Sequence, residues 1–326
     1  MKHLRSILSI TLLTLASLNC AADDYSALPY FESGPIRYGI KSENIVTRLG
    51  EAVAVLLTDK SVKSISVPYN VSRSKTNYSI EIIGPSAFAN SALESVELSD
   101  GLKYIESSAF SGCPIKRLEC PPKLRLIGEK AFSWCTELEE VVTDNNLKTV
   151  GDWAFRGCTK LRRFDCPPDM HTIGDGAFGS CSALEHITLG KDIINIGAGA
   201  FAACYNIKTI TCNNTAPHTI DDTWANGVFA TEVTNNALLI VPRGSLDIYK
   251  STDGWKNFVH IIEQHATPGD VDNDEKVSTS DVVTIYNVII GTACDDSIGY
   301  YADVNQDGEV NSADIVATYN IIVGGE

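Results

Sequence analysis

Apolar residues recur along residues 83–212 with a period of 22 or 23, so that one pattern is repeated six times. Each copy holds an Ala-Phe pair, and Leu or Ile follows five or six residues after the Phe. A unit this short buries its apolar face only by stacking on its neighbours, so the pattern predicts a solenoid. We predict that the Phe column faces the core, that a short strand ends each copy, and that the Ile-Gly or Val-Gly before most pairs makes a tight turn. The six phenylalanines are Phe88, Phe110, Phe132, Phe155, Phe178 and Phe201.

The complete pattern, I-G-x-x-A-F-x-x-C-x-x-L-x-x-I-x-L, resembles the BspA-like leucine-rich-repeat family over roughly residues 62–263. The resemblance implies a β-rich leucine-rich-repeat solenoid built from short parallel strands. We place the solenoid with its C-terminal cap at residues 83–263.

Both ends of a solenoid need a cap, because an open rung exposes apolar core and unpaired strand edges. Residues 23–82 are expected to form a mobile lead-in, up to Asn44, and an N-terminal cap with strands at 46–57 and 62–68. After Cys212 the period fails, and residues 238–242 are predicted to be a last strand. An amphipathic helix is then expected to cover the final rung with Tyr249, Trp255, Phe258 and Ile261.

The strand positions that face outward carry charge. The residues that directly follow the Leu/Ile column alternate in sign from rung to rung. We interpret them as an ion-pair ladder that holds register, with a charged recognition stripe as the alternative. The next column is not expected to cancel its own charge, which makes it the better candidate for contact with a partner. The first column is Glu94, Lys116, Glu139, Arg162, Glu185 and Lys208, and the second includes Arg117, Glu140, Arg163 and His186.

Residues 1–22 have the features of a secretory signal peptide: Lys2 and Arg5, an apolar run at 7–18, and small residues at the end. Cleavage after Ala22 would release a secreted protein. Alternatively, Cys20 is lipidated and the chain is an outer-membrane lipoprotein. Both alternatives place the protein outside the cytoplasm, and no transmembrane segment is predicted because no other run reaches 18 apolar residues.

The chain contains ten cysteines, and nine remain after Cys20. Disulfides are the first expectation in an exported protein, but eight of the nine fall in repeat columns. Because free Cys is a small, well-buried hydrophobe, we predict that the columns are reduced thiols in the core. Cys294 lies outside them.

The net charge is −15, and residues 269–326 hold twelve acids against one base. The acids follow the spacing of EF-hand calcium loops, with oxygen ligands at positions 1, 3, 5, 9 and 12 and a backbone carbonyl at position 7. Two calcium ions are therefore predicted, with weaker binding in the first loop because Glu275 replaces the position-6 glycine found at Gly308. The predicted ligand residues are Asp270, Asp272, Asp274, Lys276 and Asp281 in the first loop, and Asp303, Asn305, Asp307, Glu309 and Asp314 in the second.

Each loop leads into a predicted helix, at 282–290 and 315–323. Two loop-helix halves with Asp at position 12 resemble a type I dockerin, here at residues 269–326 after a linker at 264–268. The resemblance implies a small α-helical domain that folds on calcium and docks onto a cohesin of another protein. It also implies that loop positions 10, 11, 17 and 18 contact the partner. These are Thr279, Ser280, Tyr286 and Asn287 in one half, and Ser312, Ala313, Tyr319 and Asn320 in the other.

Catalytic and nucleic-acid-binding patterns are missing from the sequence. No nucleophile elbow, zinc-protease motif or phosphate loop is present, and no basic patch would neutralise phosphates. We expect a non-catalytic adhesion or ligand-binding protein whose solenoid binds a protein or a glycan. The alternative is a structural subunit of a multiprotein, polysaccharide-degrading assembly resembling a cellulosome.

Overall fold

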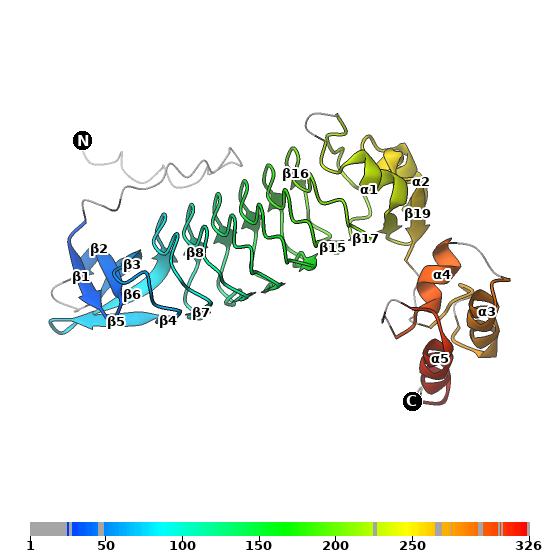
Figure 1. The fold of residues 1–326 in the computed structure, drawn as a ribbon, viewed down its shortest axis with the longest axis horizontal. Coiled ribbons are helices and arrows are strands. Elements are labelled where there is room, and N and C mark those ends of the chain that lie inside the picture. The colour runs from blue at the N-terminus through cyan, green and yellow to red at the C-terminus, as the bar shows by residue number, and fades with distance from the viewer. Residues whose placement is uncertain are drawn as a thin grey trace, which may run out of the picture.

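A computed structural model describes residues 25, 28–44, 49–223, 227–264, 269–274, 276–292, 296–305, 307 and 309–324. An elongated stack of rungs leads from an N-terminal β block to a C-terminal cap, beyond which lies a small helical unit (Figure 1). The predicted signal peptide with Cys20, most of the linker, Glu275, Cys294 and Gly308 lie outside the described residues.

The N-terminal block is more ordered than its sequence suggested. Strands β1 and β2 pair antiparallel across the segment expected to be a mobile lead-in, so that expectation is wrong for residues 30–44. Strand β3 then pairs antiparallel with β2 and parallel with β6, which joins the block to the first rung. The strands are β1 (Tyr30–Ser33), β2 (Ile36–Asn44), β3 (Leu49–Leu57), β4 (Ser64–Val67), β5 (Asn70–Arg73) and β6 (Thr76–Ile83).

Two columns of parallel strands run along the solenoid. The predicted strand at the end of each copy is present as β7 (Ser95–Leu98), β9 (Arg117–Glu119), β11 (Glu140–Val142), β13 (Arg163–Asp165), β15 (His186–Leu189) and β17 (Thr209–Cys212). The sequence reasoning missed the second column, in which the dipeptide before each Gly, or before Glu106 in the second copy, continues the sheet from β6. It consists of β8 (Tyr104–Ile105), β10 (Leu126–Ile127), β12 (Thr149–Val150), β14 (Thr172–Ile173) and β16 (Asn195–Ile196).

The phenylalanine column is confirmed as the core. All six rings are fully buried, and neighbouring centroids lie 5.0–5.5 Å apart from Phe88 to Phe201. The stack continues to Phe229, 5.2 Å from Phe201 with planes 4° apart, so a seventh rung follows where the period fails. It was missed because the segment between Phe201 and Phe229 is longer than in the other copies.

The predicted tight turn after the short strand is present: the Ala154 N–H donates to the Gly151 carbonyl at 3.2 Å, and the other copies make the same bond. The glycine itself also serves close approach between rungs. A methyl group added at Gly151 would lie 2.9 Å from the backbone nitrogen of Glu129, and at Gly197 2.4 Å from that of Asp175. Neither glycine has a positive φ. In the second copy Glu106 takes this place, where its buried carboxylate accepts a 2.8 Å hydrogen bond from the Tyr25 hydroxyl.

The cysteine columns are reduced and buried, as predicted. All eight described cysteines are free thiols inside the protein. The thiol three residues after each Phe donates to the carbonyl of the Phe in the preceding rung, for example Cys135 Sγ to Phe110 O at 3.2 Å. The other column holds Cys120, where burial raises the pKa of the thiol to about 12. Both columns therefore stabilise the interior as small, partly hydrogen-bonding side chains.

The C-terminal cap begins with α1 (Thr231–Asn236) and the predicted last strand, β18 (Leu238–Val241). The single amphipathic helix expected next is wrong. The chain instead forms α2 (Leu246–Ser251), the 3₁₀ helix η2 (Trp255–Asn257) and a further parallel strand, β19 (His260–Glu263). Of the four predicted cap residues, Tyr249, Trp255 and Phe258 are buried, and Trp255 and Phe258 contact the ring of Phe229.

The described part of the C-terminal unit contains three helices, α3 (Thr279–Ile289), α4 (Asp296–Ala302) and α5 (Ser312–Gly324). The two predicted helices correspond to α3 and α5, and α4 was not predicted. Among the described residues of this unit the core is very small, and its buried apolar residues are Val271, Ile285 and Ala302. The Tyr301 hydroxyl donates to the Glu263 carbonyl of β19, which joins α4 to the solenoid cap.

Candidate functional site

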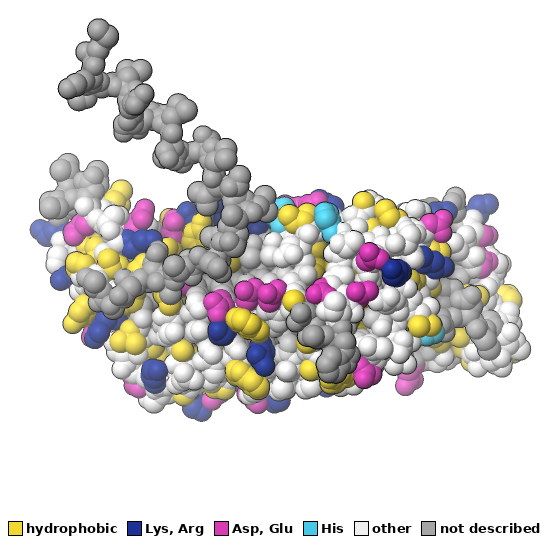
Figure 2. Space-filling model, turned by 90° about the horizontal axis from the view of Figure 1, so that it is seen from above, with side chains coloured by type: hydrophobic (Ala, Val, Ile, Leu, Met, Phe, Trp, Pro, Cys, Tyr) yellow, Lys and Arg dark blue, Asp and Glu magenta, His cyan; other side chains and the backbone are white. Residues whose placement is uncertain are grey.

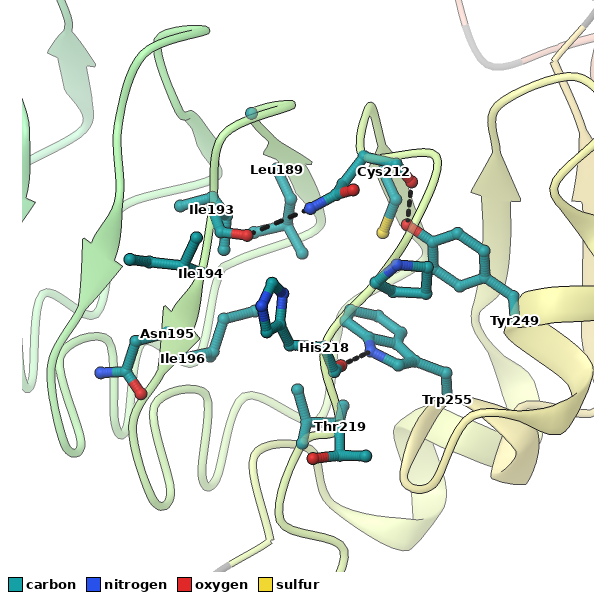
Figure 3. A pocket seen from close by; sticks show the side chains of 14 residues that line it. Leu189, Ile193, Ile194, Asn195, Ile196, Cys212, His218, Thr219, Tyr249 and Trp255 are labelled. Atoms are coloured by element: carbon teal, nitrogen blue, oxygen red, sulfur yellow. Dashed lines mark hydrogen bonds between the residues drawn. The ribbon is translucent and has the colours of Figure 1, made fainter.

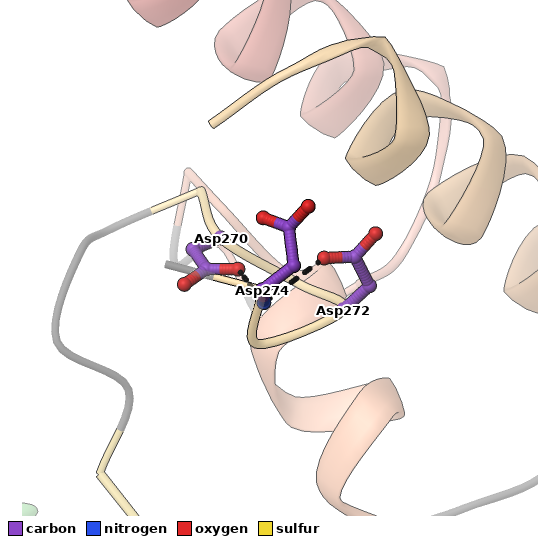
Figure 4. Close-up of side chains that lie close together, drawn as sticks. All are labelled: Asp270, Asp272 and Asp274. Carbon is purple, nitrogen blue, oxygen red and sulfur yellow. Dashed lines mark hydrogen bonds between the residues drawn. The ribbon is translucent and has the colours of Figure 1, made fainter. Parts of the chain in front are cut away.

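The first acidic loop brings three predicted ligands together. Carboxylate oxygens of Asp270, Asp272 and Asp274 lie within 4.8 Å of one another (Figure 4). The Asp274 backbone N–H donates to Asp270 Oδ1 at 3.0 Å and to Asp272 Oδ1 at 3.2 Å. The short Asp side chains therefore bond the loop's own backbone, which folds it tightly and gathers the negative charge at one point.

Asp281, at loop position 12, ties the loop to the helix that follows. Its side chain is fully buried and accepts from the backbone N–H of Val271 at 2.6 Å and of Ser278 at 2.7 Å. Ser278 is the N-cap of α3 and forms a capping box with Asp281. The carboxylate therefore holds the two ends of the loop together, and its predicted role as a ligand remains a prediction.

The second loop repeats this arrangement. Asp314 is fully buried and accepts from the N–H of Asn305 at 3.2 Å and of Asn311 at 2.9 Å. The Asp307 N–H donates to Asp303 Oδ1 at 3.1 Å. Asn at position 3 gives this loop one ligand carboxylate fewer than the first.

The donors present fit a calcium ion. Ca²⁺ prefers several oxygen ligands and tolerates irregular geometry, and Asp270, Asp272 and Asp274 supply convergent carboxylates on one turn. Lys276 and Glu309 occupy the positions that offer a backbone carbonyl, where the side chain need not be acidic. Glu309 N–H donates to Asp307 Oδ1 at 2.9 Å, as Lys276 N–H does to Asp274 Oδ1.

Each loop is followed by a helix with an exposed apolar face. Tyr286 of α3 and Tyr319 of α5, named as contact residues from the sequence, are 53% and 57% exposed. Thr279, Ser280, Ser312, Ala313 and Asn320 are also exposed, and Asn287 is half-buried. Sequence reasoning missed the exposed aliphatic neighbours on the same faces, which their spacing of three and four residues from each Tyr could have revealed. They are Val283 on α3 and Ile290 at its C-cap, and Val316 and Val323 on α5.

Comparison with protein families agrees with both parts of the fold. Six copies of the BspA type leucine rich repeat region match residues 66–182 and 127–228, which together span half of the chain. The chain belongs to the BspA-type leucine-rich-repeat family. Residues 268–321 match the dockerin type I domain, so the C-terminal unit is a dockerin. Both of the matched modules are non-catalytic, and the search of curated proteins found no match.

Several solved structures of leucine-rich-repeat and surface proteins are similar to this chain at low identity. A T. pallidum leucine rich repeat protein is 16% identical, with a TM-score of 0.40 over 82% of this chain and 97% of that one. The pneumococcal vaccine antigen PcpA is 13% identical, with a TM-score of 0.30 over 73% and 99%. A leucine-rich repeat protein from Bacteroides ovatus is 18% identical, with a TM-score of 0.28 over 57% and 72%.

The predicted contact residues of the BspA-type solenoid form one column on the strands. Arg117 and Glu140 are register partners, as are Arg163 and His186. The structure corrects the expectation that these charges do not cancel. Arg117 forms ion pairs with both Glu140 and Glu119, and Arg163 pairs with Asp165 at 2.8 Å.

The proposed ion-pair ladder in the first charged column is partly present. Lys208 lies 3.2 Å from Glu185, and Glu94 pairs at 2.7 Å with Lys63 of the N-terminal block. His186 Nδ1 lies 2.7 Å from Thr209 Oγ1, and burial together with the Arg163 guanidinium holds the pKa of His186 below its usual value. Much of the charge on the strand face is thus compensated within the protein.

A cavity lies between the sixth rung and the cap (Figure 3). The His218 side chain points into it, among Ile193, Ile196 and Trp255. Its volume is about 50 Å³, which is more than the roughly 10–15 Å³ that one water needs. Trp255 Nε1 donates to the His218 carbonyl at 2.9 Å, so a hydrogen bond holds the indole against the segment that lines the cavity.

None of the described helices is long and apolar enough to cross a membrane.

Proposed function

We propose that this protein is an exported, non-catalytic binding protein that docks onto a cohesin through its calcium-loaded dockerin, while its solenoid binds a protein or glycan ligand. The observation that carries the proposal is the duplicated loop and helix, in which an acidic loop precedes an exposed face containing Tyr286 or Tyr319. Export is supported by the charged and apolar pattern of residues 1–22. The dockerin also supports a place in a multiprotein assembly at the cell surface.

Calcium would stabilise the docking-competent fold of the dockerin. Type I dockerins typically bind this ion, and the convergent Asp270, Asp272 and Asp274 would hold it in the first loop. Asp303, Asn305 and Asp307 are placed equivalently in the second. A core with few buried residues contributes little to folding. An ion that binds the folded loops alone would add stability by mass action.

The partner would contact the exposed face of one helix at a time. Tyr286 and Tyr319 stand 33 residues apart at equivalent positions, and each has apolar neighbours on its helix. Apolar and aromatic side chains that are exposed in the free protein are the usual anchors of such interfaces. Two equivalent faces predict that loss of one Tyr is tolerated and loss of both is not.

The test is capture of the full chain by an immobilised type I cohesin, in calcium and in chelator. We expect capture in calcium and none in chelator. Tyr286→Ala or Tyr319→Ala by itself should change the affinity little, and the double variant should bind at least about tenfold more weakly. Tyr205→Ala is the matched control, since this Tyr is 61% exposed on the solenoid. Capture that is equal in chelator, or unchanged in the double variant, would contradict the proposal.

A further inference from the structure

Two columns of the solenoid have a left-handed backbone in every rung. One column lies two residues after each Gly, or after Glu106 in the second copy, and comprises Ser86, Ser108, Lys130, Trp153, Gly176 and Gly199. The other lies two residues after each Phe and comprises Asn90, Gly112, Trp134, Gly157, Ser180 and Ala203. Left-handed φ favours Gly and small polar residues. The exceptions with long side chains, Lys130, Trp134 and Trp153, all lie in two adjacent rungs.

Folding gives no reason for tryptophan at these two places. Trp134 has a φ of 61° and Trp153 a φ of 54°, which strains the backbone of a bulky residue. The Trp134 side chain is 55% exposed, so its burial does not offset the backbone strain. The other rungs show that the fold needs only a small residue here. A strained, exposed aromatic residue points to a function in binding.

Each indole lies on a glycine of the next rung. A methyl group added at Gly157 would lie 2.6 Å from Cε3 and 2.9 Å from Cδ2 of Trp134. One added at Gly176 would lie 2.6 Å from Cδ1 of Trp153. The glycines therefore make room for the rings to lie against the backbone. Trp134 is held by its own rungs while more than half of its surface is available to a ligand.

Charged residues lie next to the two indoles, Trp134 and Trp153. Lys130 Nζ lies 4.7 Å from the centre of the Trp153 ring and 2.5 Å from Glu129 Oε1, which orients the ammonium. Arg156 is exposed, and its carbonyl accepts the Trp134 backbone N–H at 2.7 Å. The Lys130 carbonyl accepts from the Ser133 N–H at 3.0 Å, so the backbones of both Lys130 and Arg156 lie beside the turn that carries Trp134. Figure 2 shows one face of the molecule, in the middle of which hydrophobic and basic side chains lie beside a row of acidic ones.

We propose that Trp134, Lys130 and Arg156 form a polysaccharide-binding site, with a pyranose ring stacked on the Trp134 indole and its hydroxyls hydrogen-bonded by the two cations. Trp153 is a positioning residue that orients Lys130. A flat, supported indole presents a face, which matches the C–H face of a sugar ring. A net charge of −15 disfavours nucleic acid, which also stacks on aromatic rings. The inference rests on the proposed binding role of the solenoid and is independent of the dockerin.

The test is affinity electrophoresis of the full chain in gels containing xylan, β-glucan or polygalacturonate. We expect retardation by at least one, weakened at least about tenfold by Trp134→Ala and largely kept by Trp134→Phe. Tyr205→Ala is the control for loss of an exposed aromatic residue. Retardation by polygalacturonate alone would indicate that Lys130 and Arg156 bind a uronic carboxylate. Retardation by a neutral glycan would indicate that they bind sugar hydroxyls. Retardation by none of the three, or an unaltered Trp134→Ala variant, would overturn the site.

Two further measurements test whether Trp134 serves the fold and whether its glycan binding is independent of cohesin docking. Trp134→Gly should melt at the same temperature or higher, because Gly suits the left-handed φ, and should still lose glycan binding. A lower melting temperature would show that Trp134 serves the fold and would overturn the inference. Cohesin capture should be unchanged by Trp134→Ala, so that failure of either proposal is seen by itself.

Discussion

Replacement of Phe155 by Ala tests the stack of rungs at its centre. The Phe155 ring is fully buried and lies between Phe132 and Phe178, with centroids 5.5 and 5.3 Å away and planes 8° and 12° apart. It also contacts Phe164 at 6.0 Å. The rungs on both sides are held by backbone hydrogen bonds, so the cavity will collapse only partly. A large-to-small core change of this kind costs about 3–5 kcal/mol, to which each lost aromatic pair contributes about 0.5–1.5 kcal/mol.

The assay is thermal unfolding followed by circular dichroism, in which this loss would lower the melting temperature by about 6–20 °C for a unit of some 200 residues. Glu139→Ala is the matched control on the neighbouring rung, since its side chain is exposed and an exposed charge contributes less than about 1 kcal/mol. Equal losses in the two variants would refute the assignment of the inside and outside of the rung.

Three further predictions concern the glycine column, the thiols and the calcium loops. Gly151→Ala should destabilise the solenoid by about 1–3 kcal/mol in urea unfolding, because its methyl group would lie 2.9 Å from the backbone of the preceding rung. Gly299 has open space around it, so Gly299→Ala should not lower the stability. Equal effects of the two variants would refute the role of close approach. Thiol labelling of the native, mature protein should modify Cys294 at most, since the eight described cysteines are buried; rapid labelling of several thiols would contradict the packing described. The 269–326 fragment should be largely unfolded in chelator and gain helix with calcium, and Asp303→Ala should impair this more than Asp270→Ala, because Gly308 gives the second loop the better position 6. Equal helicity with and without calcium would exclude calcium-dependent folding.

Much of the architecture could be read from the sequence because it repeats. A side chain such as Phe155 meets an equivalent residue on each side, so a regular period is sufficient to place it in the core. The same reasoning identified the buried thiols and the end strand of each copy. The acidic spacing located both loops because their ligands are close in sequence, and the structure brings Asp270, Asp272 and Asp274 together.

Tertiary structure decided what depends on contacts between distant segments. Phe229 stacks on Phe201 although a longer connecting segment breaks the sequence period, because side-chain contact depends on position in space and not on the length of the connecting loop. Gly151 is required because another rung approaches it, which its own turn does not reveal. Arg117 forms an ion pair with Glu140, which lies 23 residues away in the sequence. The charges in a column therefore do not by themselves show which side chains remain unpaired. Trp134 is an exposed platform only because the next rung places Gly157 beneath its ring.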